Sequence, residues 1–145
     1  MPRRVRWGHW PSGSARRMAM HESQSLFVEK QLGRNPAFLQ LISPLVKKHL
    51  GNQDAFNADN LARLYTRVKP DFIRVDADEL TYPAHIILRF EIERALVDGE
   101  IQPEDIPAIW DEKMMQYLGV DTRGNYRDGC LQDIHWTGGS FGYFP

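Results

Sequence analysis

The last stretch of the chain gathers residue types that can do chemistry. The run GCLQDIHWTGGSFGYFP, residues 129–145, combines polar and aromatic side chains with four glycines. Glycine lets a backbone approach a ligand closely, and histidine or tyrosine can orient or polarise a substrate. A plain glycine-rich turn region is the alternative interpretation. The side chains of interest in this run are Gln132, Asp133, His135, Trp136, Ser140 and Tyr143.

A second segment, HESQS, runs from His21 to Ser25 and begins like the HExxH motif of zinc enzymes. That motif places two histidines four residues apart on one helix face. Here the fifth residue is Ser25, and no other histidine in the sequence has the pairing. Glu22 can still supply one oxygen ligand, as in zinc sites with two histidines and one glutamate. A solvated helical glutamate is the alternative.

The composition is that of an ordinary soluble domain. The chain has 145 residues, 42% of them hydrophobic and 26% charged, with a net charge of −1. Nothing in this balance favours nucleic acid or a membrane as a partner. The single cysteine, Cys130, cannot form an intramolecular disulfide, which is typical of a reducing compartment. No apolar run is long enough to span a bilayer, and the basic N-terminus lacks the apolar core of a signal peptide, so we expect a cytoplasmic protein.

The first 18 residues differ from the rest. Residues 1–20 hold five arginines and no acidic residue, with Trp7 and Trp10 between them, and show no helical or strand periodicity. We predict an atypical basic lead-in over residues 1–18, either disordered or read from a shifted frame. Arginine interleaved with tryptophan also occurs in proteins that bind single-stranded nucleic acid, which is a third interpretation.

The elements that must position the candidate side chains are helices. Apolar periodicity, Asn35-Pro36 at a helix start and glycines after helix ends predict an all-α fold. Lys69-Pro70 argues for an extended segment over residues 68–76. From Gly119 onward the pattern becomes loop-like. The predicted helices cover residues 20–32, 36–50, 54–66, 83–97 and 103–118.

The helix over residues 83–97, PAHIILRFEIERALV, is the strongest of these predictions. Its two faces differ in polarity, as in an amphipathic helix that packs one side on a core. We expect Ile86, Ile87, Phe90 and Leu96 on one face and Arg89, Glu93 and Arg94 on another.

Three motifs occur in an order that is known from one family. HESQ stands at residues 21–24, IRVDAD at 73–78 and GCLQDIHW at 129–136. These segments, with DELTYPAHIILRFEIERAL between them and TGGSFGYFP after them, resemble the carboxypeptidase Taq family of zinc metallocarboxypeptidases. The resemblance covers about residues 19–145, which it identifies as part of a metallocarboxypeptidase catalytic domain.

The resemblance implies a two-lobed, almost entirely helical fold around a groove. It implies an enzyme, commonly a homodimer, that removes single residues from peptide C-termini with the help of zinc. In the family, HExxH supplies two zinc-binding histidines and the general base. Because this chain lacks HExxH, we expect a fragment that is inactive alone and does not bind zinc catalytically.

The resemblance also assigns roles to single residues. Glu22 corresponds to the third zinc ligand. Arg74 looks like a groove residue that holds the terminal carboxylate of the substrate by a bidentate pair. Gln132 resembles a substrate-binding residue, and His135 and Tyr143 resemble residues that stabilise the transition state. We expect three aspartates either to support the residues that contact metal or substrate or to be structural; these are Asp76, Asp78 and Asp133.

Two alternatives stay open. One is a non-catalytic helical module for peptide binding or dimerisation. The other is a chain that recovers activity together with a separately encoded half carrying HExxH. In neither hypothesis do we expect nucleic acid or a membrane as a partner.

Overall fold

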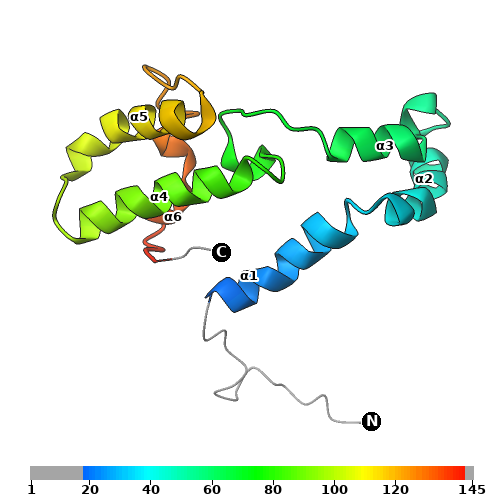
Figure 1. The fold of residues 1–145 in the computed structure, drawn as a ribbon, viewed down its shortest axis with the longest axis horizontal. Coiled ribbons are helices and arrows are strands. Elements are labelled where there is room, and N and C mark those ends of the chain that lie inside the picture. The colour runs from blue at the N-terminus through cyan, green and yellow to red at the C-terminus, as the bar shows by residue number, and fades with distance from the viewer. Residues whose placement is uncertain (1–17, 143–145) are drawn as a thin grey trace, which may run out of the picture.

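A computed structural model of the protein describes residues 18–142 (Figure 1). The regular elements in the described part of the chain are helices and short helical turns, and this part contains no β-strand. The all-α prediction is therefore confirmed. Figure 1 shows α2 and α3 together at one end and α4, α5 and α6 at the other, with α1 between them. The predicted lead-in over residues 1–18 lies, except for Met18, outside the described residues.

Helix α1, Met18–Leu26, continues directly into a π-helical turn, Phe27–Leu32. The predicted helix end at Leu32 is confirmed, and the π-helical turn was not predicted. Gly33 follows in a right-handed conformation, and its N–H donates to the carbonyl of Val28. Gly33 therefore does not use the left-handed freedom that usually places glycine after a helix. A Cβ there would lie 3.1 Å from the carbonyl oxygen of Glu29.

Helices α2, Pro36–Leu50, and α3, Ala58–Tyr65, pack against each other. Asparagine caps start both helices: the Oδ1 of Asn35 accepts from the N–H of Ala37, and the Oδ1 of Asn57 accepts from that of Asn60. Asn57 also divides the helix predicted over residues 54–66 into a 3₁₀ turn, Asp54–Phe56, and α3. The small core between them contains Leu39, Ser43 and Leu61.

Residues 66–73 form an irregular link, and a 3₁₀ turn, Arg74–Asp76, ends the stretch that we predicted to be extended. Asp78 then fixes the start of α4, because its carboxylate accepts backbone N–H bonds from Lys69, Leu80 and Thr81. Burial alone would raise the pKa of Asp78, but these bonds outweigh it and hold the pKa below its usual value. Asp78 is thus a structural residue of this link.

Helices α4, Tyr82–Val97, and α5, Ile106–Leu118, form an antiparallel pair that contains the main core. The N–H of Gln102 donates to Asp105 at 2.9 Å in the turn that starts α5. Gly119 ends α5 in the left-handed conformation that glycine adopts without strain. The core residues are Leu88, Ile92, Trp110, Met114, Leu118 and Cys130.

The C-terminal segment folds back over this helix pair. It contains a 3₁₀ turn, Cys130–Gln132, and a one-turn helix α6, Ile134–Thr137. Most of the GCLQDIHW motif, expected in a loop, therefore lies on helical turns. Gly129 is needed at its start, since a Cβ there would lie only 2.6 Å from the carbonyl oxygen of Asn125.

The expected faces of α4 were wrong in one respect. Arg89 and Glu93, which we assigned to a polar face, are 0% and 3% exposed, whereas Ile87 and Phe90 are 49% and 43% exposed. The physical reason is that the C-terminal segment supplies polar partners to the buried charges, as the next section describes. A buried charge is tolerated where it is paired and hydrogen-bonded.

None of the described helices is both long enough and apolar enough to cross a lipid bilayer.

Candidate functional site

Arg74 and Gln132 lie against each other, although 58 residues separate them in the sequence. The Oε1 of Gln132 accepts the backbone N–H of Arg74 at 2.8 Å. The Nε2 of Gln132 donates to the carbonyls of Phe72 and Asp128, each at 2.7 Å. The Arg74 guanidinium reaches the hydroxyl of Tyr82 at 3.4 Å. The two predicted substrate-binding residues are thus joined by a bond between the side chain of Gln132 and the backbone of Arg74.

His135 is held by the carboxylate of Asp133. The Oδ1 of Asp133 lies 2.6 Å from the Nδ1 of the His135 ring and also accepts the backbone N–H of His135. A carboxylate only accepts, so Nδ1 carries the hydrogen and Nε2 is the ring atom that can exchange a proton. Asp133 is itself buried beside the Arg89 side chain, with its Oδ2 3.4 Å from Nε. This is an arrangement able to orient a general acid or a hydrogen-bond donor.

Trp136 anchors the same turn to the main core. Its Nε1 donates to Glu93 at 3.1 Å, and its ring meets Trp110 edge to face with centroids 5.9 Å apart. The other carboxylate oxygen of Glu93 accepts the N–H of Gly142. The buried charges of α4 therefore serve as attachment points for the segment that carries Gln132 and His135.

His85 is a buried histidine on α4, beneath the Arg74 turn. Burial, with a smaller contribution from the Arg74 guanidinium, lowers the pKa of His85 to about 4, although Asp71 and Asp78 partly oppose the shift. His85 is consequently neutral near pH 7. His85 therefore adds no second positive charge beside the Arg74 guanidinium.

The Peptidase_M32 family, described as carboxypeptidase Taq (M32) metallopeptidase, matches residues 1–145 of the chain. The chain belongs to this family. The family resemblance predicted from the three motifs is therefore confirmed.

Curated relatives in this family are carboxypeptidases. Carboxypeptidase 1 of Bacillus subtilis is 46% identical over an alignment of 135 residues, and the match covers 88% of this chain and 26% of the relative. Thermostable carboxypeptidase 1 of Thermus thermophilus is 42% identical over an alignment of 139 residues, and the match covers 94% of this chain and 27% of the relative. The chain thus spans about a quarter of the length of the curated relatives that it matches.

Solved structures agree with the family assignment. Trypanosoma cruzi metallocarboxypeptidase 1 superposes with a TM-score of 0.86 and 52% identity, over 93% of this chain and 28% of that one. Pyrococcus furiosus carboxypeptidase, solved in an apo-Mg form, superposes with a TM-score of 0.81 and 44% identity, over 88% of this chain and 26% of that one. The helices described above therefore form part of a metallocarboxypeptidase fold.

A family of metallopeptidases implies a metal, and the candidate ligand in this chain is Glu22 on α1. The Oε2 of Glu22 accepts the hydroxyl of Ser25 at 2.7 Å. No three His, Cys, Asp or Glu side chains among the described residues gather closely enough to hold a metal ion. These residues therefore supply one carboxylate of a suitable kind and do not make a complete metal site.

The candidate residues divide between two places in the molecule. Arg74 lies in a turn that contacts α4, Gln132 lies in a turn that contacts α5 with His135 just after it, and Glu22 lies on α1. Tyr143 lies outside the described residues. Reasoning from the sequence missed Arg89 and Glu93 as supports of the site. Their four-residue spacing, shared with His85, is the pattern that indicates one polar stripe on an otherwise apolar helix.

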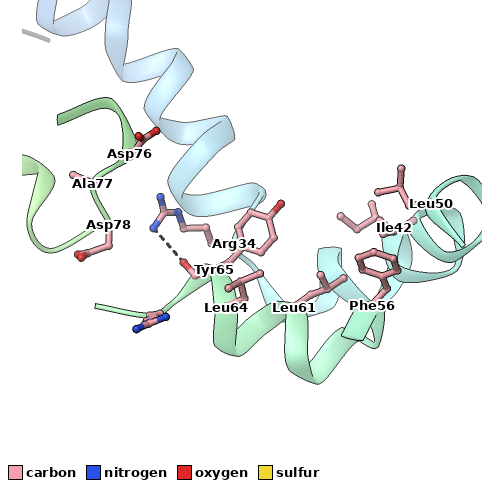
Figure 2. A pocket seen from close by; sticks show the side chains of 12 residues that line it. Arg34, Ile42, Leu50, Phe56, Leu61, Leu64, Tyr65, Asp76, Ala77 and Asp78 are labelled. Atoms are coloured by element: carbon pink, nitrogen blue, oxygen red, sulfur yellow. Dashed lines mark hydrogen bonds between the residues drawn. The ribbon is translucent and has the colours of Figure 1, made fainter. Parts of the chain in front are cut away.

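An open cavity lies elsewhere, between α2, α3 and the link before α4 (Figure 2). Its volume is about 510 Å³. Figure 2 shows an apolar wall that includes Phe56 and Leu61, with Asp76 and Asp78 on the opposite side. Arg34, which also lines the cavity, donates to the carbonyl of Tyr65 at 3.2 Å. None of the candidate substrate-binding, catalytic and metal-binding residues that the structure describes lines this cavity; these are Glu22, Arg74, Gln132 and His135.

Proposed function

We propose that this chain forms one part of the substrate groove of a zinc-dependent carboxypeptidase, which removes residues singly from peptide C-termini. The observation that carries the proposal is the junction at which Gln132 bonds to the Arg74 backbone while Asp133 orients His135. A planar guanidinium can hold a carboxylate by two parallel hydrogen bonds. An oriented imidazole beside it can donate to, or take a proton from, the reacting group.

The residues have separate tasks in this proposal. Arg74 binds the terminal carboxylate and so restricts cleavage to the chain end. His135, and Tyr143 outside the described residues, stabilise charge that develops on the substrate. Glu22 supplies one metal ligand of the assembled enzyme. Since the chain lacks HExxH, the remaining ligands and the general base come from other sequence, and the chain alone is inactive.

A graft tests the proposal. In carboxypeptidase 1 of Bacillus subtilis, the segment that this chain matches is replaced by the corresponding residues of this chain. We expect the hybrid to release single C-terminal residues from a peptide in the presence of zinc. The isolated chain with zinc is expected to release none.

Arg74 is the decisive residue in the hybrid. Arg74→Ala should lower kcat/KM by about 10³-fold or more, because a charge-assisted bidentate pair and the orientation it gives are lost. Arg74→Lys should recover only a part, since an ammonium cannot form the planar pair. Arg123→Ala, at an exposed pair with Asp121, is the matched control. Unchanged kcat/KM in Arg74→Ala would remove the carboxylate-binding role.

A non-catalytic peptide-binding module is the second candidate. It uses the same junction of Arg74 and Gln132 and requires no complete metal site among the described residues. Peptide binding by the isolated chain that survives a chelator and is lost in Arg74→Ala would support this reading. Activity of the zinc-loaded hybrid would support the enzyme instead.

We further propose that the assembled enzyme is cytoplasmic and dimeric. Cys130 is a free and buried thiol, and burial raises its pKa, so it is poorly suited to disulfide formation. Light scattering of the hybrid, in which a monomer mass would contradict the dimer, tests the assembly. Localisation of a tagged chain in fractionated cells tests the compartment.

A further inference from the structure

The side-chain amide of Gln132 is committed to backbone groups on both sides. Its Oε1 accepts from Arg74 N–H, and its Nε2 donates to two carbonyls, those of Phe72 and Asp128. All three distances are 2.7–2.8 Å. An amide side chain has two N–H donors and one carbonyl acceptor. Each of these three groups of Gln132 is therefore used within the protein.

The bonded groups are ones that need a partner. Arg74 is the first residue of a 3₁₀ turn, and the first N–H groups of a helical turn have no partner inside it. Phe72 lies two residues earlier, in the irregular link. Gln132 bonds to the carbonyl of one and the N–H of the other, as a residue in a neighbouring parallel strand would. One side chain thus replaces a strand partner for residues 72–74.

The remaining bond fixes Gln132 itself. The carbonyl of Asp128, four residues earlier, receives the second N–H of the amide. The turn that carries Gln132 is in turn held by buried Cys130 and by Asp133. Gln132 therefore connects the Arg74 backbone to the main core.

We propose that Gln132 is a positioning residue for Arg74: its amide fixes the backbone from which the guanidinium extends, and it does not bind the peptide itself. Two contacts then orient the Arg74 side chain. Gln132 holds the backbone N–H from which the side chain extends, and the Tyr82 hydroxyl contacts the guanidinium. The role rests on the proposed function in one respect, that Arg74 binds a carboxylate. Glutamate cannot replace Gln132, because a carboxylate would face two carbonyl oxygens.

Amide hydrogen exchange of the full chain, followed by NMR, tests the backbone bond directly. The variants are Gln132→Met, which keeps the length of the side chain, and Gln132→Glu, with Gln116→Met on the exposed face of α5 as the matched control. We expect exchange at the Arg74 amide to accelerate by at least about tenfold in both Gln132 variants. The amides of Leu88 and Met114 should change by less than about threefold, and Gln116→Met should change none of them.

Two results would overturn the proposal at this stage. An Arg74 amide that exchanges at the wild-type rate would show that Gln132 does not hold it. Equal acceleration at Arg74, Leu88 and Met114 would show that Gln132 supports general stability and not the Arg74 turn.

Peptide affinity separates positioning from direct contact. The probe is N-acetyl-Ala-Ala with a free carboxylate, and its C-terminal amide is the control ligand. Gln132→Met should weaken binding of the free acid by about tenfold, and should have no further effect in an Arg74→Ala background. The same loss in both backgrounds would mean that Gln132 touches the peptide, which would overturn the proposal. Failure of wild-type chain to bind the free acid would count against the proposed function of Arg74, while the exchange result still decides the role of Gln132.

Discussion

Two regions of the molecule hold their side chains by different means. In the C-terminal region, residues 74–142 with α4, α5 and α6, buried charged residues are paired across long sequence separations. In the N-terminal region, residues 18–65 with α1, α2 and α3, most side-chain bonds join residues close in sequence, as do the helix caps of Asn35 and Asn57. The buried residues among the described side chains of this second region are Leu39, Ser43 and Leu61.

The difference bears on the candidate residues. Arg74, Gln132 and His135 belong to the C-terminal region, where this chain supplies the contacts that place them. Glu22 belongs to α1, and none of the described side chains of α1 or of the π-helical turn after it is buried. We therefore propose that contacts within this chain place the substrate-binding side of the site, whereas packing from other sequence places the metal-binding side.

The largest expected effect comes from removing the carboxylate that pairs with buried Arg89. Asp133→Ala should lower the free energy of unfolding by about 3–5 kcal/mol, because one charge of a buried pair loses its partner carboxylate. Urea denaturation of the full chain measures it. Asp121→Ala, which breaks the exposed pair with Arg123, is the control and should change little. A small effect of Asp133→Ala would mean that the C-terminal region is not held by its buried charges.

Two leucines compare the cores of the regions directly. Leu88 in α4 and Leu39 in α2 are both 0% exposed. Either leucine replaced by alanine should cost about 2–5 kcal/mol. If the regions are separate units, Leu39→Ala accelerates amide exchange in α2 and α3 alone, and Leu88→Ala does so in α4 and α5. Uniform acceleration by both variants would mean that one cooperative unit spans the chain.

The sequence predicts elements where caps and glycines mark them. Helices over residues 36–50 and 83–97 were predicted to within one residue, because Asn35-Pro36, Gly51 and Gly99 give local signals that need no tertiary contact. The break at Asn57 was missed, since asparagine is tolerated inside a helix and its capping bond depends on a backbone turn.

The motifs proposed residue types for the candidate site, and these remain a prediction, but the motifs gave none of the contacts that the structure shows. Local periodicity cannot reveal that Arg89 and Glu93 are buried, because their partners Asp133 and Trp136 lie more than 40 residues away. It likewise cannot show that Gln132 bonds to the backbone of Arg74. Motifs therefore select candidate residues, and only the fold shows which distant residues these candidates contact.

The pH dependence of the free energy of unfolding tests the C-terminal region of the comparison through its buried His85. Its pKa is about 4 in the folded chain and 6.5 in the unfolded chain, mainly because of burial. The unfolded state therefore binds more protons between these values, so His85 makes stability fall as the pH drops from about 6.5 to about 4. The expected loss is roughly 2–3 kcal/mol. Urea denaturation across this window should show a smaller slope in His85→Leu, and the wild-type slope in the exposed control His49→Leu. Identical slopes in all three proteins would contradict the buried, neutral His85.

The smallest effect concerns a cap in the N-terminal region. Asn57→Ala removes the side-chain acceptor for the N–H of Asn60 and should cost about 1 kcal/mol. Amide exchange within α3 should then accelerate about fivefold, while the Met114 amide in the C-terminal region stays unchanged. Asn52→Ala, at an exposed position before the 3₁₀ turn, is the matched control. Because the cap bond is purely local, acceleration at Met114 would be evidence that the stability of α3 is shared with the distant core, and the division into two regions would fail.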